Sequence, residues 1–247
     1  MTASAAFEPG TAMRQAPVYE ETLLGSGPDE WMMTPGERVM LHFLLEHRRP
    51  ATAIEVGTAR GGSLGVIAPF AGRVYSFDID PACSQRLAGR YDNVTYVVGD
   101  SAVELPRVLA AVPQDEPVGF ILIDGGHSYE TVRDDLKSVV PLVPRETLYV
   151  LMHDAFLPGV RQAIREADWA GNAHVHSLHL DLVHGTLGET GTLQAGFALA
   201  TMRPQPREGE LRVYDREAMY RVLHAKSRYA MGGRIVRKLK RLVGLGR

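Results

Sequence analysis

Residues 54–63 read IEVGTARGGS, and this stretch decides how the chain folds. An apolar run ends at Gly57, and a glycine-rich turn leads into a segment with helical spacing of apolar residues. Glycines at such a turn let the backbone approach a ligand closely. The spacing G-x-x-x-G-G differs from the G-x-G-x-x-G of dinucleotide-binding proteins. The stretch predicts a strand, a ligand-binding turn and a helix, and it disfavours an NAD-dependent oxidoreductase.

Strand-like and helix-like segments alternate on both sides of this turn. The capping signal TPGE at 34–37 predicts the start of a helix before the first strand. Strand-like runs lie at 53–56, 73–77, 94–98, 120–123 and 148–152, and two more, HSLHLDLV and GFALATM, at 176–183 and 196–202. Such alternation predicts an α/β fold, Rossmann-like, with a mostly parallel sheet and helices on both of its faces.

The composition is that of an ordinary globular chain of 247 residues, with 45% hydrophobic and 23% charged residues. The one cysteine, Cys83, excludes an intrachain disulfide, which suits a reducing compartment. No apolar run approaches the roughly 18 residues of a membrane span, and the first residues do not resemble a secretory signal. We therefore expect a cytoplasmic protein.

Charge is distributed unevenly along the chain. Residues 216–247 hold ten Lys or Arg and one acid, a net of +9, so the first 215 residues carry −11 of the total of −2. Apolar residues at 235, 236, 239, 242 and 243 share one helical face, with basic residues opposite. This pattern indicates a helix that contacts a membrane surface or an anionic partner. A solvated, frayed end is the alternative, and no nucleic-acid partner is expected.

Three segments follow from these patterns. Residues 1–33 form an N-terminal arm with scattered Pro, Gly and Ser, and residues 34–203 form the α/β domain. Residues 204–247 form a basic, helical C-terminal extension. This extension is the segment through which we expect any contact with a membrane.

Polar residues stand where the predicted strands end. They are Gly57, Asp78, Asp100, Asp124, His153 and Asp154. In an open α/β sheet ligands bind outside the carboxyl ends of the strands, so residues scattered in sequence become neighbours there. Asp78 follows Gly57 by 21 residues, and its carboxylate can accept both hydroxyls of a ribose. The sequence therefore predicts a ligand site along this edge.

The motifs EVGTARGGS, FDID and VVGDS resemble those of the class I methyltransferases, which bind S-adenosylmethionine, and the resemblance spans about residues 35–202. It implies a seven-stranded sheet whose last strand is antiparallel. It also implies a turn beneath the methionine moiety, Ser63 at its carboxylate, Asp78 at the ribose, and Asp100 with Ser101 at the adenine. The implied cofactor-binding residues are Glu55, Gly57, Thr58, Ala59, Gly61, Ser63, Asp78, Asp100, Ser101 and Asp124.

Within that class, IDGGHSYE and LMHDAFLPG resemble the metal-dependent O-methyltransferases. The similar branch modifies macrolide or aminocoumarin sugars and cephalosporin-type compounds, and its layout is that of the catechol-type enzymes. Carried over by position, the metal ligands are Asp124, His153 and Asp154. An acid is usual where His153 stands, and an imidazole suits Mn²⁺, Fe²⁺ or Zn²⁺ better than Mg²⁺. The metal is softer than Mg²⁺, or His153 does not ligate, or the site is metal-free.

His127 follows Asp124 by three residues, where the resemblance implies a histidine that acts as the catalytic base. A neutral imidazole can take the proton of a hydroxyl as the methyl group arrives. The alternative is a solvent-facing histidine beside the helix that starts near Ser128.

Together these patterns predict an S-adenosylmethionine-dependent O-methyltransferase assisted by Mg²⁺ or Mn²⁺. The expected acceptor is a hydroxyl of a sugar, a glycan or a sugar-bearing metabolite. One alternative is a metal-independent methyltransferase of the same fold, and another is a non-catalytic module that binds membranes or anions. The family resemblance also implies a homo-oligomer formed through N-terminal segments.

Overall fold

The computed structural model describes residues 31–188 and 191–228. The predicted N-terminal arm, apart from its last three residues, and the amphipathic stretch of the basic tail lie outside these described residues. The domain boundaries at 33 and 203 stay predictions. In the part of the chain described here, no helix is both long and apolar enough to cross a membrane.

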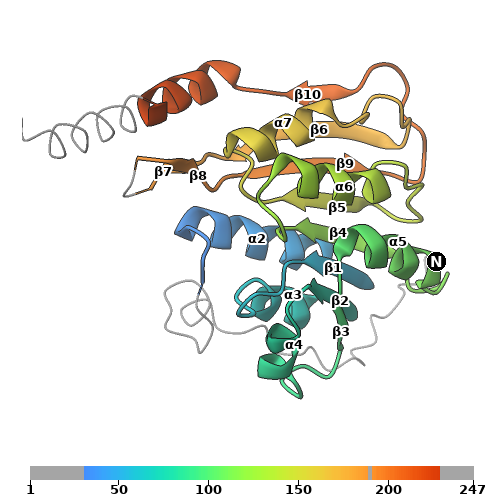
Figure 1. The fold of residues 1–247 in the computed structure, drawn as a ribbon. Helices are drawn as coiled ribbons and strands as arrows, with labels where there is room; N and C mark the ends of the chain where they lie inside the picture. The colour runs from blue at the N-terminus through green and yellow to red at the C-terminus, as the bar shows by residue number, and fades with distance from the viewer. Residues whose placement is uncertain (1–30, 189–190, 229–247) are drawn as a thin grey trace, which may run out of the picture.

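The centre of the fold is one eight-stranded sheet in the order β10-β6-β9-β5-β4-β1-β2-β3 (Figure 1). Its strands are β1 Thr52–Val56, β2 Arg73–Asp78, β3 Val94–Val98, β4 Val118–Ile123, β5 Leu148–Met152, β6 Val175–Val183, β9 Phe197–Met202 and β10 Arg212–Tyr214. β9 runs antiparallel to both of its neighbours, and every other pair in the sheet is parallel. A separate two-stranded hairpin joins β7 Thr186–Leu187 to β8 Leu193–Gln194.

The predicted fold class is confirmed, with one difference in strand number. The expected seven strands become eight because Arg212–Tyr214 pairs in parallel with β6 at the edge of the sheet. All three residues of this strand are exposed. It therefore carries no alternation of buried and exposed residues from which a strand could have been predicted.

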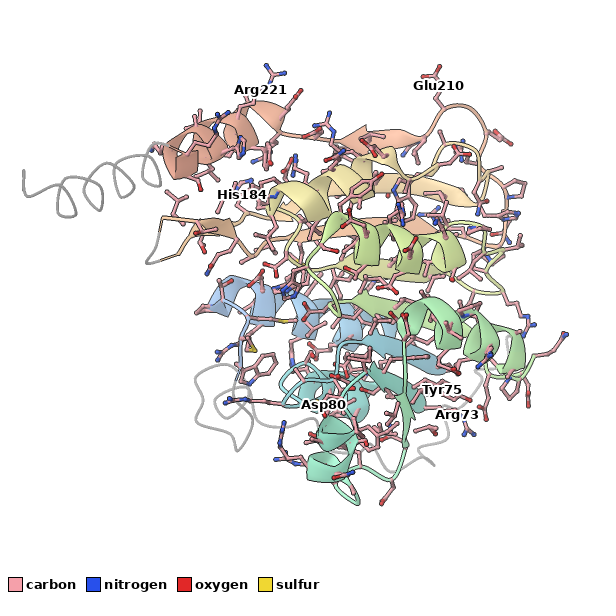
Figure 2. All side chains as sticks on the ribbon, viewed as in Figure 1. Arg73, Tyr75, Asp80, His184, Glu210 and Arg221 are labelled. Atoms are coloured by element: carbon pink, nitrogen blue, oxygen red, sulfur yellow. The ribbon has the colours of Figure 1, made fainter. Side chains whose placement is uncertain are left out.

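Helices cover both faces of the sheet. They are α2 Pro35–Arg48, α3 Leu64–Phe70, α4 Pro81–Leu87, α5 Ser101–Ala111, α6 Tyr129–Val139 and α7 Pro158–Glu166, followed by a helix over 217–228. α2, α3 and α4 contribute to one buried apolar cluster, and α5, α6 and α7 contribute to another. Outside these layers, charged side chains such as Arg221 and Glu210 point to solvent (Figure 2).

The strands supply both clusters by simple alternation. In β4, Ile121 and Ile123 belong to the cluster under α5–α7, whereas Phe120 and Leu122 belong to the cluster under α2–α4. Successive side chains of a strand point to opposite faces, so a continuous apolar run such as FILI fits a strand covered on both sides. This burial fixes where each central strand ends, and hence where the polar residues after it lie.

Candidate active site

A cleft with a volume of about 420 Å³ opens at the carboxyl ends of β1, β2, β4 and β5. This volume is within the range usual for small-molecule sites. Its walls include Trp31, Met33, Gly57, Thr58, Ala59, Ser63, Asp78, Asp124, His127, His153, Asp154, Leu157, Thr192 and Ala195. The structure thus brings most of the predicted site residues into one cleft.

The turn after β1 is shaped by close backbone contact. Gly57 has φ +101°, and a Cβ atom there would lie 2.3 Å from the carbonyl oxygen of Asp124. Only glycine fits both the left-handed conformation and this approach. Ala59 also has a positive φ, +44°, and its N–H donates a hydrogen bond to Asp78 Oδ2 at 2.8 Å. The turn is therefore held between the ends of β2 and β4.

Glu55 lies beneath the turn and is fully buried. Its carboxylate accepts hydrogen bonds from Ser63 Oγ at 2.6 Å and from Ser76 Oγ at 2.5 Å. Burial raises the pKa of Glu55 to about 8, although both hydrogen bonds lower it. Through these hydrogen bonds Glu55 supports the turn from beneath, and it does not line the cleft. Gly61, also predicted at the cofactor, packs against Leu87 instead.

A smaller pocket of about 190 Å³ adjoins the cleft and shares Gly57, Asp78 and Gly125 with it. Asp100 and Ser101, predicted on the adenine side, line this pocket. Asp100 also caps α5, because its Oδ1 accepts a hydrogen bond from Ala102 N at 3.0 Å. Apart from Glu55 and Gly61, the predicted cofactor residues line these two pockets along one edge of the sheet.

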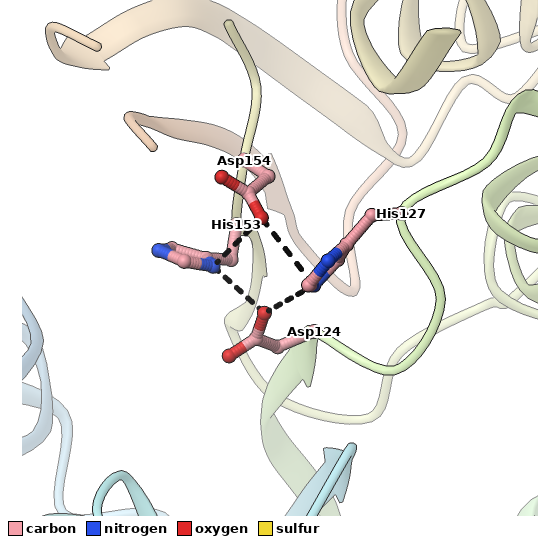
Figure 3. Close-up of side chains that lie close together, drawn as sticks. All are labelled: Asp124, His127, His153 and Asp154. Carbon is pink, nitrogen blue, oxygen red and sulfur yellow. Dashed lines mark hydrogen bonds and ion pairs between the residues drawn. The ribbon is translucent and has the colours of Figure 1, made fainter. Parts of the chain in front are cut away.

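Two imidazoles and two carboxylates of the cleft lining converge on one another (Figure 3). His153 Nδ1 lies 2.7 Å from Asp124 Oδ1 and 3.7 Å from Asp154 Oδ2. His127 Nε2 lies 3.5 Å from Asp124 Oδ1 and 3.3 Å from Asp154 Oδ2. One potential ligand atom from each residue falls within 4.8 Å of the others. The predicted base and the predicted metal ligands thus form a single group.

Backbone contacts hold this group in place. Asp124 N donates to Val56 O at 2.8 Å, and His153 N donates to Ile123 O at 3.0 Å, so strand pairing continues up to the cluster. Asp154 has φ +53° and accepts a hydrogen bond from Ala195 N at 2.6 Å. His127 stands on the loop between β4 and α6, with its side chain 50% exposed. The cluster therefore has three fixed members and one that faces solvent.

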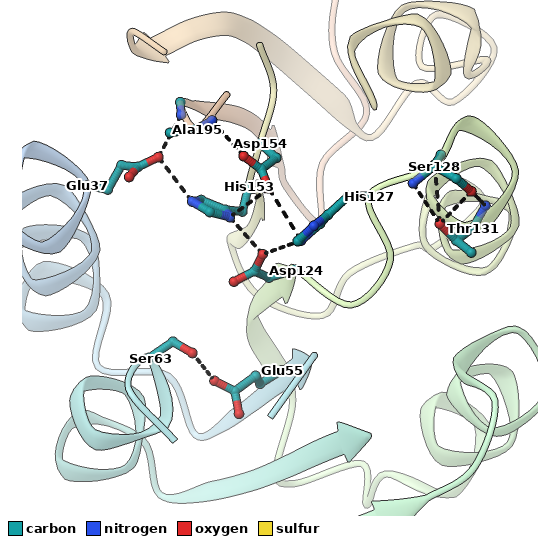
Figure 4. A network of polar contacts seen from close by, with 11 residues as sticks. Glu37, Glu55, Ser63, Asp124, His127, Ser128, Thr131, His153, Asp154 and Ala195 are labelled. Carbon is teal, nitrogen blue, oxygen red and sulfur yellow. Dashed lines mark hydrogen bonds and ion pairs between the residues drawn. The ribbon is translucent and has the colours of Figure 1, made fainter. Parts of the chain in front are cut away.

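Glu37, on α2, is a member of this network that the sequence did not predict (Figure 4). Its Oε1 lies 3.1 Å from His153 Nε2, a charge contact whose angle is not that of a hydrogen bond. The same oxygen accepts a hydrogen bond from Gly196 N at 2.6 Å, and Oε2 accepts one from Thr34 N at 2.7 Å. In the sequence, Glu37 stood out only as part of the capping box at the start of α2, and that capping box is confirmed.

The charges of the cluster stabilise one another. Burial lowers the pKa of His153, but the charges and hydrogen bonds of Asp124, then Glu37 and Asp154, raise it well above its usual range. Burial raises the pKa of Asp124, yet the two imidazoles bring it below its ordinary value. The contact with Asp124 raises the pKa of His127. With no cation bound, an imidazolium at His153 balances the surrounding carboxylates.

The donor set fits a divalent metal ion. Ligand bonds of about 2.0–2.2 Å place neighbouring ligand atoms about 3 Å apart. The contacts among Asp124, His127, His153 and Asp154 run from 2.7 to 3.7 Å, with His153 Nδ1 directed at the group. Two imidazoles and two carboxylates suit a first-row transition ion.

Comparison with known proteins agrees with the fold and the turn. Residues 54–155 match the family model described as a methyltransferase domain. An O-methyltransferase from Bacillus cereus, solved in complex with SAH, shares 18% identity over 69% of this chain and 82% of its own, with a TM-score of 0.54. No curated protein matches the sequence significantly.

Two further solved structures share the fold. TomG, an O-methyltransferase from Streptomyces achromogenes involved in tomaymycin synthesis and solved with SAM, has 21% identity over 69% of this chain and 81% of its own, with a TM-score of 0.52. Cofactor-bound Rv0187 from MTB has 22% identity over 75% of this chain and 94% of its own, with a TM-score of 0.53. Residues 54–155 thus carry the sequence pattern of a methyltransferase domain, and the solved structures agree with the predicted Rossmann-like fold.

Proposed function

We propose that this chain transfers the methyl group of S-adenosylmethionine to a hydroxyl of a sugar, a glycan or a sugar-bearing metabolite, with the assistance of a divalent metal ion. One observation carries the proposal. The cluster of Asp124, His127, His153 and Asp154 shares a cleft with the glycine-rich turn after β1. A methyl acceptor bound at the cluster would therefore lie beside a cofactor bound at the turn.

In the proposed complex, the turn lies along the methionine moiety of the cofactor. Gly57 and Ala59 offer backbone close to the ligand, and Asp78 accepts hydrogen bonds from the ribose hydroxyls. The adenine occupies the adjoining pocket beside Asp100 and Ser101. The support for this arrangement is the continuity of the two pockets through Gly57 and Asp78.

Asp124, His153 and Asp154 would hold the ion, in agreement with the donor spacing. When bound, a divalent ion lowers the pKa of a coordinated hydroxyl, which otherwise ionises poorly at neutral pH. The protein itself must carry out the rest of catalysis. The cleft must align the acceptor oxygen, the methyl carbon and the departing sulfur, and must exclude water as the bond forms.

His127 is the proposed base. It combines a half-exposed side chain with an Nε2 atom that faces the cluster. As the acceptor oxygen bonds to the methyl carbon, the carbon–sulfur bond breaks and its electron pair returns to the sulfonium. The hydroxyl proton passes to His127 Nε2 and then to solvent. The products are a methyl ether, S-adenosylhomocysteine and a proton.

Apolar side chains in the lining support an acceptor with an apolar face. Trp31, Met33 and Leu157 are among the residues that line the cleft. Aromatic and aliphatic side chains pack against the C–H faces of sugars and against hydrophobic aglycones.

A metal-independent methyltransferase is the second candidate. The 2.7 Å contact between His153 Nδ1 and Asp124 favours it, because an imidazolium there already balances the carboxylates. His127 would then act as the base without help from an ion.

Acceptor screening with and without a chelator tests both candidates. The purified chain would be incubated with S-adenosylmethionine and a panel of sugar-bearing metabolites, and S-adenosylhomocysteine and methylated product would be measured. Chelation should abolish turnover, and added Mn²⁺ or Mg²⁺ should restore it. Turnover that persists in the chelator would select the metal-independent reaction. No product with any hydroxyl acceptor, beside product with amine or thiol acceptors, would contradict O-methylation.

A further inference from the structure

We propose that Glu37 is a positioning residue that fixes His153 as a metal ligand through Nδ1, and that this pairing makes the site prefer a first-row transition ion such as Mn²⁺ over Mg²⁺. The inference rests on the proposed metal-assisted function and assigns to Glu37 a role beyond the cap of α2.

The His153 ring is held in one orientation by its surroundings. Its side chain is 8% exposed, and its two nitrogens face different carboxylates. Nε2 faces Glu37 at 3.1 Å, and Nδ1 faces Asp124 at 2.7 Å. Phe197 packs edge-on against the ring, with centroids 5.3 Å apart. With a proton on Nε2, 3.1 Å from the Glu37 carboxylate, the lone pair of Nδ1 is left to point to the place where Asp124, Asp154 and His127 converge.

Glu37 is itself held in a fixed position. It is fully buried, and its two oxygens are held by the N–H groups of Gly196 and Thr34. Metal-binding histidines generally contact a carboxylate or carbonyl through their other nitrogen, which fixes the tautomer and increases the basicity of the ligand. Removing such a partner typically weakens metal binding by about 10- to 100-fold. Glu37 has the burial, charge and proximity of this partner.

A histidine among the ligands affects which ion the site prefers. Mg²⁺ favours oxygen ligands and keeps much of its hydration, whereas imidazole best suits Fe²⁺, Ni²⁺, Cu²⁺ and Zn²⁺, and Mn²⁺ begins the same first-row series. A ligand set that includes His153 therefore departs from magnesium chemistry. Because Glu37 holds the ring in a single orientation, the nitrogen is presented before an ion arrives.

The test is a set of calorimetric titrations on the metal-stripped full chain saturated with S-adenosylhomocysteine. Mn²⁺ and Mg²⁺ would be titrated into the wild type, Glu37→Gln and Thr34→Ala. Co²⁺ would be added separately, and its visible absorption would report nitrogen ligation. Thr34→Ala is the matched control, because it removes the other half of the capping box, whose Oγ1 accepts from Glu37 N at 3.4 Å, and leaves the Glu37 carboxylate in place.

We expect the wild type to bind Mn²⁺ at least about tenfold more tightly than Mg²⁺. Glu37→Gln should weaken Mn²⁺ binding by about 10- to 100-fold and change the Co²⁺ spectrum, while cofactor affinity and the Thr34→Ala variant stay near wild type. If Glu37→Gln fails to fold, His153→Ala replaces it and should reduce Mn²⁺ affinity more than Mg²⁺ affinity.

Two results would overturn the inference while leaving metal assistance intact. One is equal affinity for Mn²⁺ and Mg²⁺, and the other is a loss of Mn²⁺ binding in Thr34→Ala as large as in Glu37→Gln. If no ion binds the wild type although the cofactor does, the proposed metal assistance fails together with the role of Glu37.

Discussion

Asp78 accepts a hydrogen bond from the backbone N–H of Ala59 across 2.8 Å, which ties the end of β2 to the turn after β1. The same carboxylate lines both the main cleft and the adjoining pocket. One side chain therefore shapes the turn and, in the proposed complex, presents an acceptor to the cofactor. This acid at the end of β2 lies outside the cluster of Asp124, His127, His153 and Asp154.

Replacing Asp78 with Asn should weaken cofactor binding. An amide offers one acceptor oxygen, so it cannot bond Ala59 N and both ribose hydroxyls as a carboxylate can. We expect the affinity for S-adenosylhomocysteine, measured by calorimetry, to fall by about tenfold or more, since hydrogen bonds to a charged group contribute about 1.5–3 kcal/mol. Asp80→Asn is the control, because Asp80 caps α4 outside both pockets. Equal affinity in Asp78→Asn and wild type would remove Asp78 from the cofactor site.

Gly57→Ala should damage the turn. The new Cβ would lie 2.3 Å from the Asp124 carbonyl oxygen in a backbone with φ +101°. We expect the free energy of unfolding to fall by about 2–5 kcal/mol in urea titrations, with loss of cofactor binding. At Gly89, φ is +73° but nothing lies within 4 Å of an added Cβ, so Gly89→Ala should cost only about 1–2 kcal/mol. Equal costs at the two positions would argue against the close approach.

Glu55 should make stability depend on pH. Its pKa is raised from 4.5 to about 8 by burial, so the folded state retains a proton that the unfolded state has already lost. The stabilisation is complete below about pH 4.5 and is lost as the pH rises towards 8. Urea unfolding at several pH values should therefore show wild type losing stability over this window relative to Glu55→Gln. Parallel curves for the two proteins would indicate that Glu55 is ionised in the fold.

Arg161 should stabilise the edge of the sheet that lies next to the helix over 217–228. Its guanidinium contacts Asp181 at 3.0 Å and Asp215 at 2.8 Å, and all three side chains are largely buried. Arg161→Met leaves the buried Asp181 without its cation and Asp215 with Arg165 alone, and should lower the free energy of unfolding by about 3–5 kcal/mol. Arg165, 41% exposed and 3.1 Å from Asp215, is the control, and Arg165→Met should cost less than about 1 kcal/mol. A small effect at Arg161 would show that the pair does not anchor this region.

His127→Gln tests the proposed base. The variant should bind the cofactor like wild type but lose about 100- to 10,000-fold in kcat, the usual contribution of general acid–base catalysis. Because His127 Nε2 also faces Asp124 and Asp154, ion affinity should be measured in parallel. A fall in ion affinity with kcat preserved at saturating ion would assign His127 to metal binding rather than to proton transfer.

The sheet was predictable because its central strands are buried on both faces and therefore appear as short apolar runs. FILI at 120–123 and LYVLM at 148–152 end at the polar residues that the structure gathers in the cleft. The edge strand Arg212–Tyr214 and helix α7 were not predicted. The strand is exposed throughout, and α7 follows Leu157, whose side chain supplies no capping hydrogen bond that could mark the start of a helix.

The site was predictable only where its residues follow strands. Asp124, His153 and Asp154 come directly after β4 and β5, so their convergence follows from parallel topology. Glu37 lies 116 positions before His153 and carries a local capping signal that accounts for it fully in the sequence. Its contact with His153 depends on how α2 packs against β4 and β6, and no pattern within the sequence specifies that packing.

The central claim is best tested by calorimetry on the metal-stripped chain, with S-adenosylhomocysteine added first and Mn²⁺ second. We predict that the cofactor binds, that one Mn²⁺ per chain then binds to the complex, and that Asp124→Asn abolishes the ion binding while retaining the cofactor. Cofactor binding without any ion binding in the wild type would contradict metal assistance, and absence of cofactor binding would contradict the methyltransferase site itself.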